Sequence, residues 1–89
     1  MDLQTKYRIK TKIKLRREKF GGITYDHETG TLQFIHSSIL VRFLENDGQL
    51  TLQEMADKIF APEKASEQVL KNVLVKLTGF QQRGIIHEV

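Results

Sequence analysis

The segment FGGITYDHETGTLQFIH, residues 20–36, contains two runs of strand-forming residues separated by a turn. Each run is rich in β-branched and aromatic residues, which favour extended structure. The intervening DHETG ends in Gly30, and glycine tolerates the left-handed backbone conformation that closes a short hairpin loop. We therefore predict two antiparallel strands, at residues 20–26 and 31–36, in which Gly21–Gly22 marks a strand bend or a close backbone approach.

A strongly alternating segment, YRIKTKIKLRR at residues 7–17, precedes this hairpin. Lysine or arginine occupies every even position from Lys6 to Arg16, and the odd positions hold Ile9, Ile13 and Leu15. A period of two predicts a strand with one apolar and one solvated face. This first strand and the hairpin would form a three-stranded antiparallel meander. Residues 1–11 are predicted to be a basic N-terminal extension, and residues 12–89 the domain itself.

After the hairpin, the apolar period changes to that of a helix. Ser37 or Ser38 can cap the N-terminus of a first helix, ILVRFLEND at residues 39–47, and Gly48 suits its C-terminal end. The next helix is indicated by Thr51 and Glu54, whose spacing is that of a capping box.

The second helix is predicted at residues 52–60, and the third at about residues 66–82, with Gly84 at its end. The last five residues, IIHEV, predict a short terminal strand. The predicted fold class is therefore α+β: a three-stranded antiparallel sheet followed by three helices, similar to a winged helix-turn-helix.

The composition is that of a single folded domain, with 89 residues, 39% hydrophobic and 28% charged. Cysteine is absent, which excludes disulfides, thiolate nucleophiles and iron–sulfur ligation. The sequence has no apolar run long enough to span a membrane and no signal-peptide pattern at its N-terminus. We expect a cytoplasmic protein that does not associate with membranes.

Positive charge is concentrated at the N-terminus. Residues 1–22 hold eight of the 14 Lys and Arg but only two of the 11 Asp and Glu, whereas residues 23–89 hold six basic and nine acidic residues. A winged-helix nucleic-acid binder would carry basic residues on its third helix, which has only Lys71 and Lys76 in its body. Nucleic-acid binding is therefore an alternative hypothesis, and we expect no nucleic-acid partner.

The sequence offers no convincing catalytic or metal-binding group. His27, His36 and His87 lack metal-ligand spacing, and the triplet Asp26–Glu28 falls in the predicted hairpin turn. The serines at positions 37 and 38 lie where a helix N-cap is expected rather than a nucleophile. We expect no enzymatic activity, no metal and no cofactor.

The outer strands of the predicted meander differ in charge. The first has Lys or Arg at every second position, and charges of this kind protect an edge against pairing with another strand. The third, TLQFI at residues 31–35, has neither a charged residue nor a proline. Such an edge is covered by the chain itself, pairs with a second copy in a dimer, or binds an extended peptide by β-augmentation.

The third helix has one apolar residue outside its predicted core stripe of Leu70, Val73, Leu74 and Leu77. Val75 lies beside Lys71, Thr78 and Gln82 on the helical wheel. An isolated surface valine is common, but next to an open strand Val75 could form one wall of a groove. Lys71 would then offer a positive charge to an acidic residue of the ligand.

Several of these segments carry a resemblance to a known family. LRREKFGGITYDHETGTLQFIHSS, ENDG, LTLQEMADKI and VLVKLTGFQQRGII, within residues 12–86, resemble the PqqD-like family of small peptide chaperones, the RiPP recognition elements. Within that family, EKFGGITYD and LQFI are most similar to the chaperone of the mycofactocin system.

The resemblance implies a non-catalytic protein that binds the leader segment of a ribosomally synthesised precursor peptide. In such proteins the leader adds as an antiparallel strand to the third strand and lies against the third helix. The family also implies a complex with a modifying enzyme, commonly a radical SAM enzyme. By position, the resemblance assigns peptide binding to Leu32, Gln33, Phe34, Ile35, His36, Lys71, Leu74, Val75 and Thr78.

Overall fold

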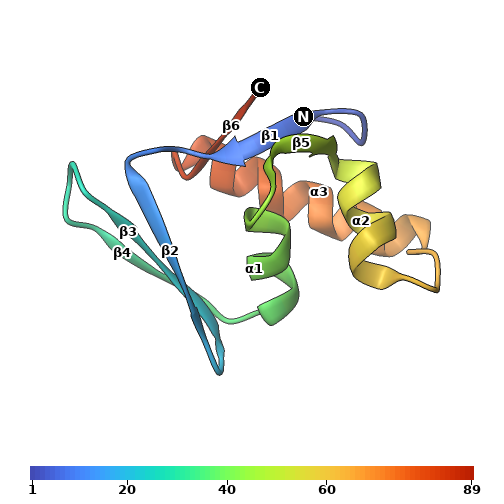
Figure 1. Ribbon diagram of the computed structural model, residues 1–89, viewed down its shortest axis with the longest axis horizontal. Coiled ribbons are helices and arrows are strands. Elements are labelled where there is room, and N and C mark those ends of the chain that lie inside the picture. The colour runs from blue at the N-terminus through green and yellow to red at the C-terminus, as the bar shows by residue number, and fades with distance from the viewer.

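The computed structural model describes residues 1–89 and contains six strands and three helices (Figure 1). The elements are β1 (Lys6–Ile9), β2 (Ile13–Glu18), β3 (Gly21–Asp26), β4 (Leu32–Ile35), α1 (Ser38–Leu44), β5 (Asp47–Thr51), α2 (Leu52–Phe60), α3 (Glu67–Gln82) and β6 (Ile86–Glu88). The strands form two three-stranded antiparallel sheets, with orders β2-β3-β4 and β5-β1-β6. Figure 1 shows the first sheet projecting to the left of the helices and the second lying above them. The predicted α+β class is confirmed, with a second sheet added.

The predicted meander is present as β2, β3 and β4, and its two glycines permit close packing. Gly21 has a φ of +146°, and a side chain there would collide with the carbonyl oxygen of Ile35. At Gly22, a Cβ atom would lie 2.7 Å from Cγ2 of Val41 in α1. The close backbone approach predicted for this pair is confirmed, and it lets α1 pack directly on the sheet.

The alternating segment forms two strands in different sheets, which corrects the prediction of one continuous first strand. The chain turns at Thr11 and Lys12, where the amide of Ile13 donates to the carbonyl of Lys10 at 2.9 Å. β1 then pairs with β5 and β6, whereas β2 pairs with β3. The alternation continues unbroken through the turn, and the partners of β1 lie much later in the chain, so the pattern could not reveal the break.

The first residues of the chain, predicted as a basic extension, pack into the fold. Tyr7 is fully buried, and its hydroxyl donates to the carbonyl oxygen of Phe43 at 2.9 Å. The carbonyl of Leu3, a residue that packs against the core, accepts from the amide of Gln53 at 2.9 Å. The alternation within β1 therefore separates a buried tyrosine from solvent-exposed basic side chains.

The first helix is shorter than predicted, because residues 47–51 form strand β5 instead. Ser37 caps α1 by accepting a hydrogen bond from the amide of Leu40, as predicted for this pair of serines. After the helix, Asn46 Nδ2 donates to the carbonyl of Leu50 at 2.9 Å and stabilises the turn into β5. Gly48 adopts a φ of +88° within the strand. A glycine with positive φ suits a helix end and a strand irregularity equally, so its identity did not distinguish them.

The sequence signals predicted for the ends of the other two helices are confirmed. Thr51 and Glu54 form the capping box of α2: the Thr51 hydroxyl accepts from the Glu54 amide at 3.1 Å, and Glu54 Oε1 accepts from the Thr51 amide at 2.9 Å. Ser66 caps α3, and Gly84 follows its end with a φ of +77°. The predicted terminal strand is β6, at residues 86–88.

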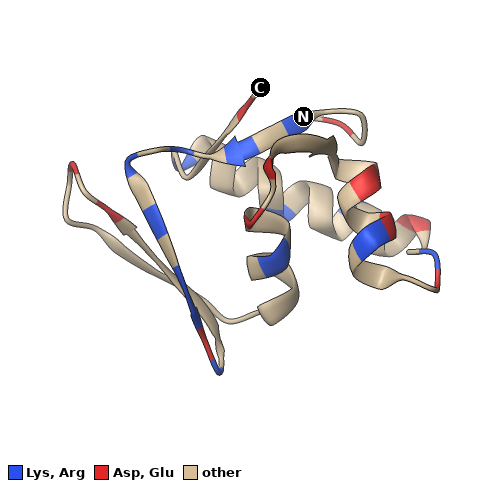
Figure 2. Ribbon diagram, viewed as in Figure 1, with Lys and Arg blue, Asp and Glu red and all other residues tan.

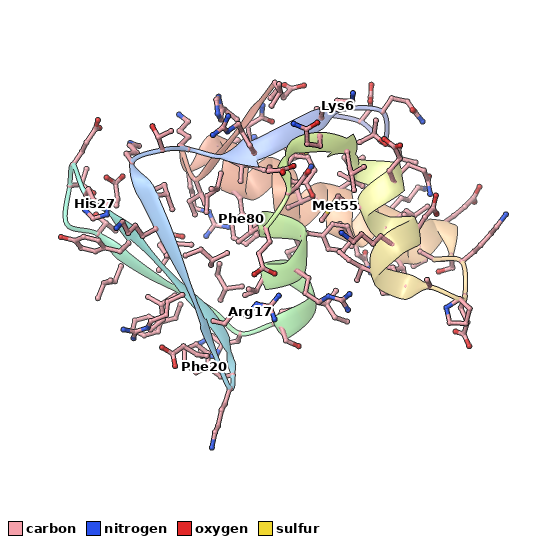
Figure 3. The ribbon with its side chains drawn as sticks, in the orientation of Figure 1. Lys6, Arg17, Phe20, His27, Met55 and Phe80 are labelled. Atoms are coloured by element: carbon pink, nitrogen blue, oxygen red, sulfur yellow. The ribbon has the colours of Figure 1, made fainter.

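The core includes side chains from every helix and from both sheets. Its buried apolar residues are Tyr7, Ile13, Ile35, Val41, Phe43, Leu44, Leu52, Met55, Ala56, Val73, Leu77, Phe80, Ile85 and Ile86. Figure 3 shows Met55 and Phe80, both labelled, inside the helical part of the molecule. None of the helices combines the length and the apolar character needed to cross a membrane.

Candidate functional site

Strand β4 has a neighbour on one side only. The order β2-β3-β4 makes it an edge, and its four residues include no charge and no proline. Asp26 donates its backbone N–H to the Thr31 carbonyl at 2.9 Å, and hydrogen-bonded pairs alternate along antiparallel strands. By that alternation, the backbone groups of Leu32 and Phe34 point away from β3. β4 therefore offers unpaired donors and acceptors to an incoming strand.

The predicted strand residues divide between two faces of the sheet. Leu32 and Phe34 stand opposite Tyr25 and Ile23, and their side chains are 53% and 58% exposed. The side chain of Ile35 is directed to the opposite face and is buried there. A strand added beside β4 would likewise alternate its side chains between an outer and an inner face.

The inner-face residue Gln33 connects β4 to the C-terminal end of α3. Arg83 Nη1 donates to Gln33 Oε1 at 3.2 Å, and the guanidinium group lies 5.0 Å from the centre of the Phe80 ring. Gln33 and Arg83 border a cavity of about 240 Å³. Its lining residues are Lys12, Ile13, Thr24, Asp26, Thr29, Thr31, Gln33, Arg83 and Ile85.

Arg83 was not among the residues predicted from the sequence. A basic residue at the C-terminus of a helix is a recognised local signal, because its charge is favourable beside the last carbonyl groups. That signal could have marked the position of Arg83. It could not have named Gln33 as the partner, since the two residues are 50 positions apart.

The predicted helix residues lie farther towards the N-terminus of α3. Val75 is 69% exposed, Thr78 is half-buried and Leu74 packs against the core. Lys71 and Leu74 border a second hollow of about 380 Å³, together with Leu3, Glu67 and Leu70. The structure thus joins β4 to α3 at Arg83, whereas Lys71 and Leu74 adjoin the N-terminal segment.

The opposite edge of the same sheet, β2, is strongly charged. Figure 2 shows basic residues along β1 and β2 and none on β4. Arg17 points to the helices, where its Nε donates to Glu45 Oε2 at 2.8 Å, and Arg16 Nε pairs with Glu18 Oε1 at 2.6 Å. The charge difference predicted between the two outer strands of the meander is present in the structure.

The Asp26–Glu28 triplet forms the hairpin turn, as predicted. Asp26 Oδ1 accepts hydrogen bonds from the amides of Glu28 and Thr29 at 2.8 and 3.2 Å, and Lys12 Nζ lies 3.2 Å from Asp26 Oδ2. Desolvation opposes ionisation of Asp26, but these donors and the lysine together lower the pKa of its carboxyl group. Asp26 therefore stabilises the turn as a carboxylate.

The histidines are separate from one another. The ring of His27 packs edge-on against Tyr25 with 4.9 Å between ring centres, and that of His36 lies 5.2 Å from Phe20. No group of three His, Asp or Glu side chains has an arrangement that could hold a metal ion.

In this α+β domain, β4 is an exposed sheet edge without charge, which is the feature that binds an extended peptide in domains that use β-augmentation. The sequence matches the peptide chaperone MftB family over residues 6–87. The chain belongs to this family, and the resemblance stated from the sequence is confirmed.

A solved structure supports the fold independently. The chain is similar to a structure described as lasso peptide synthetase B1 complexed with the leader peptide, with a TM-score of 0.69 and 14% sequence identity. The similarity covers 92% of this chain and 98% of that one. At this identity the match establishes a shared fold. No curated protein matches the sequence.

Proposed function

We propose that the protein binds the leader segment of a ribosomally synthesised precursor peptide along β4 and presents it to a modifying enzyme. The open, uncharged edge of β4, with the backbone groups of Leu32 and Phe34 directed outward, is the observation that supports this function best. Membership of a peptide chaperone family agrees with it. So does the fold shared with a protein whose structure is described as complexed with a leader peptide.

In this proposal the leader forms a fourth strand, antiparallel to β4. Its backbone pairs with Leu32 and Phe34, so alternate leader side chains fall next to these two residues on the outer face. The remaining side chains point inward, to Gln33 and the cavity beside Arg83. The predicted contacts on Ile35, His36, Lys71, Leu74, Val75 and Thr78 remain part of the proposed site, and Arg83 is added to it.

The enzyme that receives the peptide is proposed to be a radical SAM enzyme, as the family resemblance implies. The protein itself supplies binding and orientation in this scheme. Holding a leader on a fixed strand edge raises the local concentration of the attached core peptide at the enzyme, without a chemical step in the chaperone.

The main experiment is an NMR titration of the ¹⁵N-labelled protein with synthetic leader segments of candidate ribosomal precursor peptides. We expect the amide signals of residues 31–36, and of residues 71–83 on one face of α3, to change their chemical shifts. The chemical shifts of the β2 amides should stay unchanged. A peptide of the same composition in scrambled order is the control. Shifts confined to β2, or no binding of the leader, would contradict the proposal.

Pairing of β4 with a second copy is the competing use of the same edge, because a self-complementary strand can form a two-fold interface. Light scattering with and without the leader separates the two. We expect a monomer that binds one leader. A dimer that persists when the leader is saturating would assign β4 to self-association instead.

A further inference from the structure

The face of the β2-β3-β4 sheet that points away from the helices is unusually apolar for a solvent-exposed surface. We call it the outer face and define its apolar part as Phe20, Ile23, Tyr25, Leu32 and Phe34. Four of these side chains are between 38% and 58% exposed, and Ile23 is half-buried. Single exposed apolar residues are ordinary, whereas a contiguous group of this kind marks an interaction surface.

Strand register places these residues together. Tyr25 stands opposite Leu32 and Ile23 opposite Phe34, so all four project from the same side of the paired strands. The ring of Phe20 lies 6.2 Å from that of Phe34. Figure 3 shows Phe20 and His27 on the side of this sheet away from the helices, whereas Arg17 points to α1.

Basic side chains border the apolar group on strand β2. Lys14 stands opposite Tyr25 and Arg16 opposite Ile23, and both are exposed. Arg16 forms an ion pair with Glu18, whereas the ion pairs of the structure do not include Lys14 or the nearby exposed Lys19. A complementary partner would therefore present apolar side chains flanked by carboxylates.

This charge pattern distinguishes between the candidate partners. A second copy would present the same apolar and basic face, on which the carboxylate of Glu18 is already paired with Arg16. Lys14 and Lys19 would therefore find no acidic partner across a two-fold interface.

A duplex nucleic acid would use the lysines but would leave the aromatic and aliphatic centre without a matching surface, because its affinity comes mainly from phosphate contacts. A single strand could stack bases on the exposed aromatic rings, but it would not match the aliphatic Ile23 and Leu32, and Arg16 is already paired with Glu18. A protein with acidic residues around an apolar patch complements both the apolar centre of the outer face and its basic border.

We infer that the outer face docks the modifying enzyme, through an apolar patch flanked by acidic residues on that enzyme. The inference rests on the proposed leader binding, because a leader strand beside β4 would extend this same face with its own outward side chains. The enzyme would then contact the chaperone and the leader on one continuous surface. Docking of this kind favours the loaded chaperone over the empty one.

The test uses the full chain and the purified radical SAM enzyme that modifies the precursor whose leader is added. Enzyme affinity is measured by interferometry for the wild type and for the double variant Tyr25→Ser/Lys14→Glu, each with and without saturating synthetic leader. Lys14 lies on β2 and Tyr25 on β3, so neither substitution changes a β4 backbone group that would pair with the leader. Lys58→Glu, an equal charge reversal at an exposed position of α2, is the matched control.

We expect the double variant to bind the enzyme about tenfold more weakly, since it removes an aromatic contact and reverses a rim charge. Its affinity for the leader in the absence of enzyme should stay within about twofold of the wild type, because the β4 backbone groups that pair with the leader are unchanged. Lys58→Glu should change neither affinity. The leader should strengthen enzyme binding to the wild-type chain.

Four results would overturn the inference. Two concern the enzyme: the wild type does not bind it, or the wild type and the double variant bind it equally well. The other two are a loss of leader affinity in the double variant as large as its loss of enzyme affinity, and a dimer that the wild type forms but the double variant does not. A fifth result, binding of a duplex or single-stranded oligonucleotide at physiological salt that is lost in the double variant, would assign the face to nucleic acid and also overturn the inference. If the wild type fails to bind the leader, the proposed function fails. In that case, the enzyme affinities of the wild type and the double variant without leader still test whether the outer face docks the enzyme.

Discussion

The two sheets of this domain have equal numbers of strands but differ in the chemical character of their exposed faces. In the β5-β1-β6 sheet, the middle strand contributes the fully buried Tyr7, and β6 contributes the fully buried Ile86. In the β2-β3-β4 sheet, the outer face leaves Tyr25, Leu32 and Phe34 in contact with solvent. The β5-β1-β6 sheet thus mainly stabilises the domain, whereas the β2-β3-β4 sheet buries Ile13 and Ile35 on one face and presents apolar surface on the other.

This difference follows from how each sheet is connected. β2, β3 and β4 are consecutive in the chain and joined by short turns, so the meander forms from local hairpins. β1 instead pairs with strands that follow α1 and α3, so its sheet forms only when the helices are in place. A sheet of local hairpins can keep one face and one edge uncovered because the other sheet and the helices hold the core.

The largest expected effect comes from truncating the buried tyrosine. Tyr7→Ala should lower the free energy of unfolding by about 3–5 kcal/mol, because it leaves a cavity in the core and removes a hydrogen bond. The matched substitution in the other sheet, Tyr25→Ala, should cost less than about 1 kcal/mol. Urea unfolding followed by circular dichroism measures both. Equal losses would contradict the division between a stabilising and a presenting sheet.

A charge on the open edge should impair binding but not folding. Phe34→Lys places an ammonium group where the leader strand would lie, and we expect the dissociation constant of the leader to rise by about tenfold. The unfolding midpoint should barely change, since Phe34 is 58% exposed. Calorimetric titration and thermal unfolding give the two values. Unchanged leader affinity in the folded variant would count against binding at β4.

Removing a single hydroxyl group tests the buried sheet more finely. Tyr7→Phe should cost about 1 kcal/mol, because the ring still fills the core but the hydrogen bond to the Phe43 carbonyl is lost. The cost stays moderate since that carbonyl also accepts from the amide of Asn46 at 3.3 Å. Tyr25→Phe is the exposed counterpart and should be close to neutral. If both substitutions were neutral, the buried hydrogen bond would not stabilise the domain.

The smallest expected effect is a pH dependence at the turn of the presenting sheet. Because the pKa of Asp26 is lowered in the folded state, the unfolded chain binds this proton more readily. The stabilisation by Asp26 is therefore present above the ordinary carboxyl pKa of about 3.9 and is lost as pH falls through the lower folded value.

Urea midpoints of the wild type and Asp26→Asn at pH 7 and pH 3 measure this contribution. We expect the wild type to have the higher urea midpoint at pH 7 and the difference between the two midpoints to be smaller at pH 3. Glu63→Gln, at an exposed position in the loop after α2, is the control and should give a gap that is small at both values. A gap for Asp26→Asn that does not change with pH would exclude the carboxylate as the stabilising group.

Elements that depend on neighbouring residues were predicted well from the sequence. The bounds of α2 follow from the Thr51–Glu54 capping box and the apolar period after it, all within ten positions. The β3–β4 hairpin follows similarly from its turn residues. The break between β1 and β2 and the existence of β5 were not predicted, because they depend on pairing between segments far apart in the chain.

The candidate site shows the same division. The absence of charge and proline on β4 is a local property, so the open edge could be recognised before the structure was known. The contact of Arg83 with Gln33 could not be recognised from the sequence, since it depends on where the end of α3 meets the sheet. The apolar outer face could not be recognised from the sequence either, because it requires β3 and β4 to pair in one particular register.

By itself, the sequence determined the meander, the three helices with their caps and the contrast between a charged and an uncharged edge. Each of these depends on side chains within a few residues of one another. The tertiary structure alone decided that the basic N-terminal segment is divided between two sheets. It also decided that β4 meets α3 at Arg83 and that five apolar side chains share one exposed face. These features arise from burial of the core and strand pairing across the whole chain, which no short window of sequence contains.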